Sequence, residues 1–110
     1  MWICLYVAEA VREREALVAR DKAALINAEA KLAVLEARLP FPHSCAVQGA
    51  DRLRELRPRG GRSPWRALNR QIGGQLVIAA VCPETNIDPR GSAAACRHAE
   101  SRLARFEGAT

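Results

Sequence analysis

The stretch LRELRPRGGRSPWRALNRQI, residues Leu53 to Ile72, has the pattern of two β-strands joined by a turn. In the first strand, Leu53 to Arg57, alternate side chains fall on opposite sides, and the same holds for the second strand, Trp65 to Ile72. The intervening segment PRGGRSP, residues 58–64, has the glycine and proline content of a tight turn. We therefore expect an antiparallel pair of strands here.

Positive charge is concentrated in the same stretch. Seven of the seventeen basic residues lie in it or just before it: Arg52, Arg54, Arg57, Arg59, Arg62, Arg66 and Arg70. From residue 51 to residue 72 they are opposed by only two acidic residues, which leaves +5, the formal net charge of the whole chain. A basic charge focused in one segment favours an anionic partner, either nucleic acid or an acidic protein surface.

The sequence after this stretch predicts one more strand and a helix. A Gly-Gly pair at 73–74 is a hairpin signal. The apolar run Gln75 to Cys82 is typical of a central strand that is buried on both faces. An Asp-Pro pair at 88–89 is an N-cap followed by proline at the first helical position. The pattern then predicts a C-terminal amphipathic helix over residues 89–106.

The sequence before this stretch predicts a strand and a helical hairpin. The short apolar run WICLYV, residues 2–7, is typical of a strand covered by other elements. Residues 8–39 lack glycine and proline and are rich in helix formers. We place a break at Arg20 and Asp21, because Asp21 is a good N-cap, and prefer a helical hairpin to one unbroken coiled-coil helix. Residues 40–51, with two prolines and a glycine, are expected to form a loop.

These elements follow the order β-α-α-β-β-β-α in a single domain of residues 1–110. The expected fold class is α+β: a curved, mostly antiparallel sheet, basic over residues 53–82, with the N-terminal helical hairpin and the C-terminal helix on one side. The opposite face or the rim of the sheet then remains for the arginines. The apolar content of 49% is sufficient for a core.

Composition also limits the kind of protein. No run is long enough to span a membrane, and the N-terminus lacks the basic region and cleavage site of a signal peptide, so we expect a cytoplasmic protein without membrane contact. The cysteines form no C-x-x-C pair and are interpreted as buried, reduced thiols. They are Cys4, Cys45, Cys82 and Cys96. The sequence predicts neither a metal site nor a cofactor.

The element order and several short motifs together resemble the RelE/ParE superfamily of bacterial toxins, most of all its phage-related, HigB-like branch. The motifs are LRELR at 53–57, PWR at 64–66, the Gly-Gly pair before an apolar strand, and Ala99, Arg102 and Leu103 in the last helix. The resemblance covers essentially all 110 residues. It implies the toxin of a type II toxin–antitoxin system, an endoribonuclease that cleaves mRNA at the ribosome. It also implies an antitoxin partner, expected to be a helix-turn-helix protein from the adjacent gene.

Cleavage of RNA by its own 2′-hydroxyl requires placement of the strand, neutralisation of the phosphate charge and proton transfer. Arginine forks on rigid strands suit the first two tasks. The resemblance matches Arg57 and Arg66 to the recurrent strand arginines of the family, and we predict them as the catalytic pair. The predicted RNA-binding residues are Arg54, Arg59, Arg62 and Arg70.

The sequence does not identify the proton-transfer residue. The family often has an aromatic residue, commonly Tyr, where this chain has Asn69, and residues 83–89 lack the lysines usual in the branch. His43 is interpreted as a loop residue in preference to a general base, Glu55 as the partner of a neighbouring arginine, and Trp65 as a packing residue in preference to a base-stacking platform. Two alternatives therefore stay open: a degenerate relative that only binds its antitoxin, and a ParE-type inhibitor of DNA gyrase.

Overall fold

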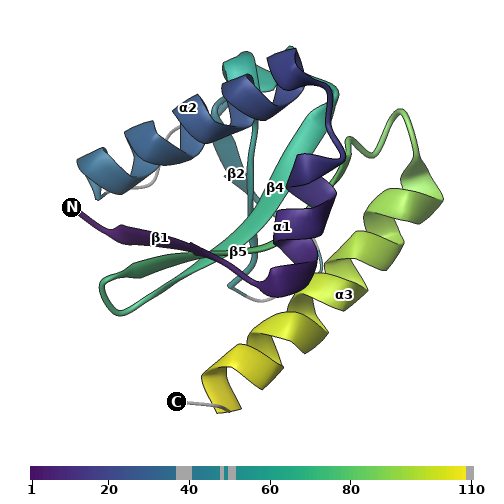
Figure 1. The fold of residues 1–110 in the computed structure, drawn as a ribbon. Helices are drawn as coiled ribbons and strands as arrows, with labels where there is room; N and C mark the ends of the chain where they lie inside the picture. The colour runs from purple at the N-terminus through teal and green to yellow at the C-terminus, as the bar shows by residue number, and fades with distance from the viewer. Residues whose placement is uncertain (37–40, 48, 50–51, 109–110) are drawn as a thin grey trace.

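The structure is a computed structural model, which describes residues 1–36, 41–47, 49 and 52–108. Along the chain the elements are β1 (Ile3–Tyr6), α1 (Ala8–Glu15), α2 (Ala19–Leu35), β2 (Ser44–Ala46), β3 (Arg54–Leu56), the 3-10 turn η1 (Pro58–Gly61), β4 (Trp65–Ile72), β5 (Gln75–Pro83) and α3 (Pro89–Gly108), as Figure 1 shows. The predicted order is confirmed, with β2 as an additional strand inside the segment that the sequence predicts as a loop.

Within the described residues, five strands form one mixed sheet in the order β1-β5-β4-β3-β2. β1 runs parallel to β5, and the other neighbouring pairs are antiparallel. The mostly antiparallel α+β fold is therefore confirmed. The register of β4 and β5 shifts once, because Leu68 pairs with Ala80 whereas Asn69 pairs with Ile78. Ala79 is thus an extra residue in β5, a β-bulge.

The helices cover both faces of this sheet. Trp65 and Arg70 are an odd number of residues apart on β4, so their side chains point to opposite faces. The indole Nε1 of Trp65 donates to Asp21 of α2 at 3.1 Å, whereas Nη1 of Arg70 donates to Glu107 of α3 at 2.8 Å. The prediction that the helices lie on one side is therefore wrong. The apolar β5 explains the difference, because Leu76 to Cys82 are all buried and such a strand requires cover on both faces.

The predicted pair of N-terminal helices is confirmed, but the turn between them lies earlier than predicted. α1 ends at Glu15 and α2 begins at Ala19, with the extended Val18 as its N-cap residue. Asp21 lies instead in the first turn of α2, where a carboxylate is favourable beside the helix N-terminus. Its carboxylate also accepts the hydrogen bond from Trp65. The side chain predicted as the helix N-cap therefore forms a tertiary contact with β4 instead.

The hydrophobic core lies between the sheet and the helices. α2 contributes Leu25 and Leu32, and α3 contributes Ala99 and Leu103. Leu35, at the C-terminal end of α2, is exposed. In the part of the chain that the structure describes, no helix combines the length and the apolar character needed to cross a membrane.

All four cysteines are free thiols. Burial raises the pKa of Cys4 and of Cys82 to about 12, so both are protonated at neutral pH. The prediction of buried thiols holds for Cys82, whereas Cys4, Cys45 and Cys96 are partly buried. The described residues contain no cluster of three or more histidine, cysteine or acidic side chains placed to hold a metal ion.

Candidate nucleic-acid interface

The seven arginines of residues 52–70 do not share one face of the sheet. The structure divides them among three places. One groove is lined by Arg57, Arg59 and Arg62, a second groove is lined by Arg52, Arg54 and Arg70, and Arg66 is buried. The arginines predicted for catalysis and for RNA binding are therefore found at places that differ in exposure and in charge.

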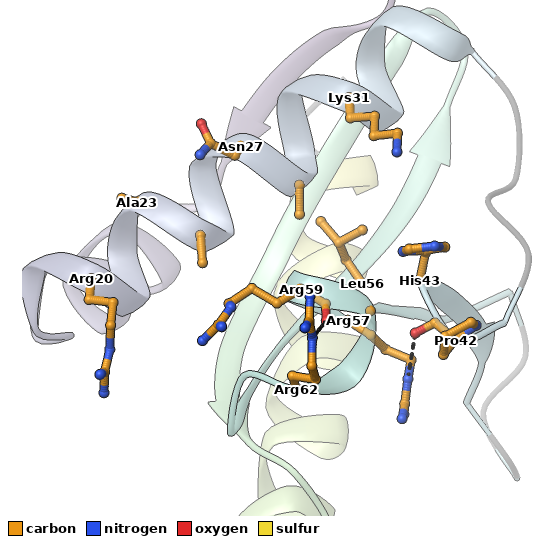
Figure 2. Close-up of a pocket in the computed structure, with 13 residues that line it drawn as sticks. Arg20, Ala23, Asn27, Lys31, Pro42, His43, Leu56, Arg57, Arg59 and Arg62 are labelled. Carbon is orange, nitrogen blue, oxygen red and sulfur yellow. Dashed lines mark hydrogen bonds between the residues drawn. The ribbon is translucent and has the colours of Figure 1, made fainter.

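The larger site is a groove of about 780 Å³ between α2 and η1, here called the α2–η1 groove (Figure 2). It is lined by Arg20, Ala23, Ala24, Asn27, Ala28, Lys31, Pro42, His43, Leu56, Arg57, Arg59, Gly60 and Arg62. Five of these described lining residues are cations. None of the thirteen lining residues carries a carboxylate. Small or apolar side chains lie between the cations. A groove of this character accommodates a chain of anions such as a nucleic-acid backbone.

One face of α2 supplies half of the groove. Its lining residues, from Arg20 to Lys31, recur at the three- and four-residue spacing of a single helix face, with alanines between the two cations. Arg20 and Lys31 are eleven positions apart, which is about 16 Å along a helix axis. Sequence reasoning missed both cations, because mixed acidic and basic residues on α2 are typical of a solvated surface. The alanine face between them is the signal that could have found them.

η1 supplies the other half of the groove through an irregular backbone. Pro58 opens the turn, and Arg59, Gly60 and Gly61 follow with positive φ angles of 58°, 63° and 90°. Glycine adopts this conformation readily, whereas for Arg59 it costs about 1 kcal/mol. A Cβ on Gly61 would lie 2.9 Å from Nη2 of Arg57, so a larger residue there would displace the guanidinium.

Arg57 is held in position by three contacts. Nε donates to the carbonyl of Pro42 at 2.9 Å, the bond dashed in Figure 2, and Nη1 donates to Glu55 at 2.8 Å. Cζ lies 5.1 Å from the centre of the Phe41 ring, a cation–π distance. The predicted pairing of Glu55 with a neighbouring arginine is confirmed. Its side chain is 19% exposed, so Arg57 is fixed in position while part of its side chain meets solvent.

Arg66 is buried, with 2% of its side chain exposed. Nη1 donates to the carbonyl of Ser63 at 2.7 Å, and Nη2 donates to Glu84 at 2.5 Å. Burial, and secondly the charge of Arg57, lower the pKa of Arg66. Glu55 links the two arginines, since its Oε1 lies 2.8 Å from Nη1 of Arg57 and 4.0 Å from Nε of Arg66. The two arginines predicted for catalysis are therefore neighbours, and of the two only Arg57 lines the α2–η1 groove.

The second groove has a volume of about 330 Å³. It is lined by Trp2, Leu32, Ser44, Ala46, Arg52, Leu53, Arg54, Asn69, Arg70, Gln71 and Leu76. Nη2 of Arg54 donates to Oγ of Ser44 at 3.2 Å. Arg70 pairs with Glu100 at 3.2 Å and with Glu107 at 2.8 Å, both on α3. Because α3 compensates the charge of Arg70, this groove attracts anions less strongly than the α2–η1 groove.

Trp65 and Asn69 serve the fold. Trp65 packs partly buried against the core, which confirms its interpretation as a packing residue. Asn69 is buried, and its Nδ2 donates to the carbonyl of Ala67 at 2.9 Å. The side chain that replaces the family's frequent aromatic residue is thus engaged inside the protein. His43, by contrast, is exposed and lines the α2–η1 groove.

Solved structures of toxins share this arrangement of elements. A chain of the RelB–RelE antitoxin–toxin complex from Methanococcus jannaschii matches 76% of this chain and 93% of its own length, with 10% identity and a TM-score of 0.58. A mutant of the E. coli toxin RelE in the free state matches 80% of this chain and 87% of its own length, with 13% identity and a TM-score of 0.60. A mutant of YafQ from E. coli matches 80% of this chain and 99% of its own length, with 13% identity and a TM-score of 0.60.

No family model and no curated protein matches the sequence. The structural likenesses, at 10% to 13% identity, show the fold: this chain has the RelE-like α+β fold. The resemblance to the RelE/ParE superfamily that the motifs predict is confirmed at this level. Assignment to the HigB-like branch stays a prediction.

Proposed function

We propose that this chain is the toxin of a type II toxin–antitoxin system and cleaves mRNA at the ribosome, with the α2–η1 groove as its RNA site. One observation carries the proposal: five cations and no carboxylate are found among the described residues that line this groove. The RelE-like fold, which solved toxins share, supports it. Attraction of this kind is how proteins hold and position a nucleic-acid backbone.

In this proposal the rim of the groove binds RNA, and Arg57 acts on the reacting phosphate. The phosphates of a single strand contact Arg59 and Arg62 on one side and Arg20 and Lys31 on the other. Pro42 and Glu55 engage two of the five N–H donors of the Arg57 guanidinium. The remaining donors stabilise the charge that develops when the neighbouring 2′-hydroxyl attacks the phosphate.

The proposal places Arg66 behind Arg57. Arg66 lies near Glu55, which binds Arg57, and donates to the carbonyl of Ser63. In the proposal these contacts fix the backbone and the carboxylate beside the Arg57 side chain. Arg66 therefore supports the reaction by positioning Arg57. Arg54 and Arg70 extend the basic surface at the second groove and contact more distant parts of a bound strand.

The proposed partners are mRNA on the ribosome and an antitoxin. The similar chain from Methanococcus jannaschii belongs to an antitoxin–toxin complex, which supports an antitoxin for this chain as well. A helix-turn-helix protein encoded by the adjacent gene is the expected form. An acidic antitoxin segment would neutralise the groove cations and exclude RNA. These partners place the protein in the cytoplasm.

Expression of the chain in bacteria tests the proposal. We expect growth arrest with truncated ribosome-bound transcripts for the wild type. In Arg57→Ala, cleavage is expected to slow by about 100- to 1,000-fold, because a preorganised donor to the developing charge is lost. Arg97→Ala is the matched control, since Arg97 is exposed on α3 and does not line the groove. Normal growth and intact transcripts in cells that express the wild-type chain would contradict the proposal.

A second candidate function is a toxin relative that binds its antitoxin without cleaving RNA. The inward hydrogen bond of Asn69 and the pairing of Arg66 with Glu84 favour it, because both side chains are engaged within the protein. Tight co-purification with the adjacent gene product, together with intact RNA, would select this function. Supercoiling by DNA gyrase, measured with and without the protein, tests the ParE-type alternative.

A further inference from the structure

We infer that His43 is the residue that accepts the proton of the attacking 2′-hydroxyl in the α2–η1 groove. The inference rests on the proposed function and supplies the one task that the arginines cannot perform. Among the described lining residues, the ionisable side chains are four arginines, one lysine and His43. Arginine and lysine side chains are hydrogen-bond donors without an acceptor atom, whereas the neutral imidazole of a histidine has a ring nitrogen that can accept a proton. Within this set, His43 is therefore the group suited to act as a general base.

The sheet places His43 directly beside Arg57. Ser44 pairs with Leu56 in the register of β2 and β3, and the carbonyl of His43 accepts the backbone N–H of Arg57 at 2.8 Å. This hydrogen bond continues the antiparallel pairing of the two backbones by one residue beyond the printed strands. The proton acceptor and the phosphate ligand thus come from paired backbone positions.

The imidazole of His43 is exposed and lies over Gly60. A Cβ on Gly60 would lie 3.5 Å from Cε1 and 3.7 Å from Nδ1 of His43. Figure 2 shows the ring in the wall of the groove beside Pro42 and Leu56. Neither ring nitrogen forms a hydrogen bond to another described side chain or carbonyl. The ring is therefore accessible to a strand that lies along the groove.

The chemical step transfers one proton and exchanges one bond at phosphorus. Neutral His43 accepts the 2′-hydroxyl proton while the 2′-oxygen forms a bond to the adjacent phosphorus. The bond from phosphorus to the 5′-oxygen of the next nucleotide breaks, and that oxygen takes a proton from water. The products are a 2′,3′-cyclic phosphate and a 5′-hydroxyl, and the imidazolium returns its proton to the solvent. Arg57 balances the negative charge that builds on the phosphate oxygens.

The test compares the purified full chain with His43→Ala and with His98→Ala. His98, the other histidine of the sequence, is exposed on α3 and does not line the groove. Cleavage is measured on single-stranded RNA, both free and on translating ribosomes. Binding is measured with an oligonucleotide of the same sequence whose 2′-hydroxyls are replaced by hydrogen. We expect His43→Ala to lower cleavage by about 100- to 10,000-fold with unchanged binding, and His98→Ala to retain both.

Added imidazole separates lost proton transfer from a structural defect, because a small base restores cleavage only in the first case. Partial rescue of His43→Ala by imidazole supports the inference. Cleavage by His43→Ala at the wild-type rate, parallel loss of binding and cleavage, or absence of rescue overturns it while the proposed function stands. A wild type that cleaves neither free nor ribosome-bound RNA overturns the proposed function itself.

Discussion

Gly61 lies against the Arg57 guanidinium and has a backbone conformation that favours glycine. Its φ is +90°, and a Cβ would approach Nη2 of Arg57 to 2.9 Å. We expect Gly61→Ala to lower the free energy of unfolding by about 1–2 kcal/mol, from backbone strain and crowding. We also expect cleavage to fall as in Arg57→Ala, because the guanidinium must move. Urea denaturation and the cleavage assay measure the two effects.

Gly74→Ala is the matched control for this substitution. A Cβ on Gly74 meets no atom within 4 Å, and its φ is not in the left-handed region. If Gly61→Ala proves as stable and as active as Gly74→Ala, the position of the guanidinium does not depend on Gly61.

At the scale of single residues, the sequence predicts chemical type but not exposure. Arg62 and Arg66 are four positions apart in one basic stretch, yet Arg62 is exposed in the groove and Arg66 is buried. The difference arises from Glu84 and the carbonyl of Ser63, which compensate a buried guanidinium. Glu84 is remote in sequence, so the pattern around Arg66 contains no sign of it.

At the scale of elements, the side chains of Glu13 and Arg102 bind backbone groups of β5 beyond the end of its neighbour β1. β1 ends opposite Ile78 of β5. Beyond that point the carbonyl of Ala79 accepts from Nη1 of Arg102 at 3.0 Å, and the N–H of Val81 donates to Glu13 at 3.0 Å. Arg102 and Glu13 also bind each other through two hydrogen bonds of 3.0 Å. α1 and α3, which lie side by side in Figure 1, are thus attached to the sheet at the bulge.

We expect Glu13→Ala to lower the free energy of unfolding by about 2 kcal/mol, because the N–H of Val81 and the guanidinium of Arg102 lose their partner. Glu15→Ala on the same helix is the control, since the partners of Glu15 among the described residues, Arg14 and Lys22, form surface ion pairs with it and little change is expected. Urea denaturation of both variants measures the effect. Equal small changes would mean that Glu13 contributes no more than a surface ion pair.

Glu29 of α2 predicts a pH dependence of stability. It is buried and accepts a hydrogen bond from the hydroxyl of Tyr6 on β1. Burial raises the pKa of Glu29 above its ordinary value of 4.5, so the folded chain holds this proton more tightly than the unfolded chain. Its contribution to stability is complete below about pH 4.5 and is lost as the pH rises through the folded-state pKa. We therefore expect Glu29→Gln to gain stability relative to the wild type as the pH rises.

Glu9→Gln on α1 provides a control of opposite sign. A hydrogen bond from Arg105 lowers the pKa of Glu9, so its contribution is present above the unfolded value and is lost as the pH falls. Urea denaturation between about pH 4 and about pH 7 follows both variants against the wild type. A Glu29→Gln difference that does not change with pH would contradict the assignment.

At the scale of the whole molecule, the five cations of the α2–η1 groove predict how RNA binding depends on salt. Each phosphate contact to a single strand contributes about 0.7 to the slope of log affinity against log salt concentration, so five contacts give a slope of about −3.5. We expect Lys31→Gln to reduce the magnitude of this slope by about 0.7, and Arg97→Gln to leave it unchanged. Titrations at several salt concentrations, with the oligonucleotide that lacks 2′-hydroxyls, measure it. Equal slopes for the wild type and Lys31→Gln would remove Lys31 from the interface.

Local patterns in the sequence predict the order of the elements, the bounds of β4 and the glycine turn that follows Arg57. These features depend on neighbouring residues, through alternation, helix propensity and turn chemistry. The sequence also determines which segment carries the net charge. β2 was missed because prolines and a glycine around it are typical of a loop, although its pairing with β3 is a contact between distant residues.

Packing between elements sets which arginines meet solvent and which meet carboxylates. α3 covers the face of β4 that carries Arg70, and Glu84 compensates Arg66, so both arginines are buried within the basic stretch. α2 brings Arg20 and Lys31 into the groove that Arg57 also lines. The physical reason is that exposure and charge compensation are set by packing between elements, which no local pattern in the sequence encodes.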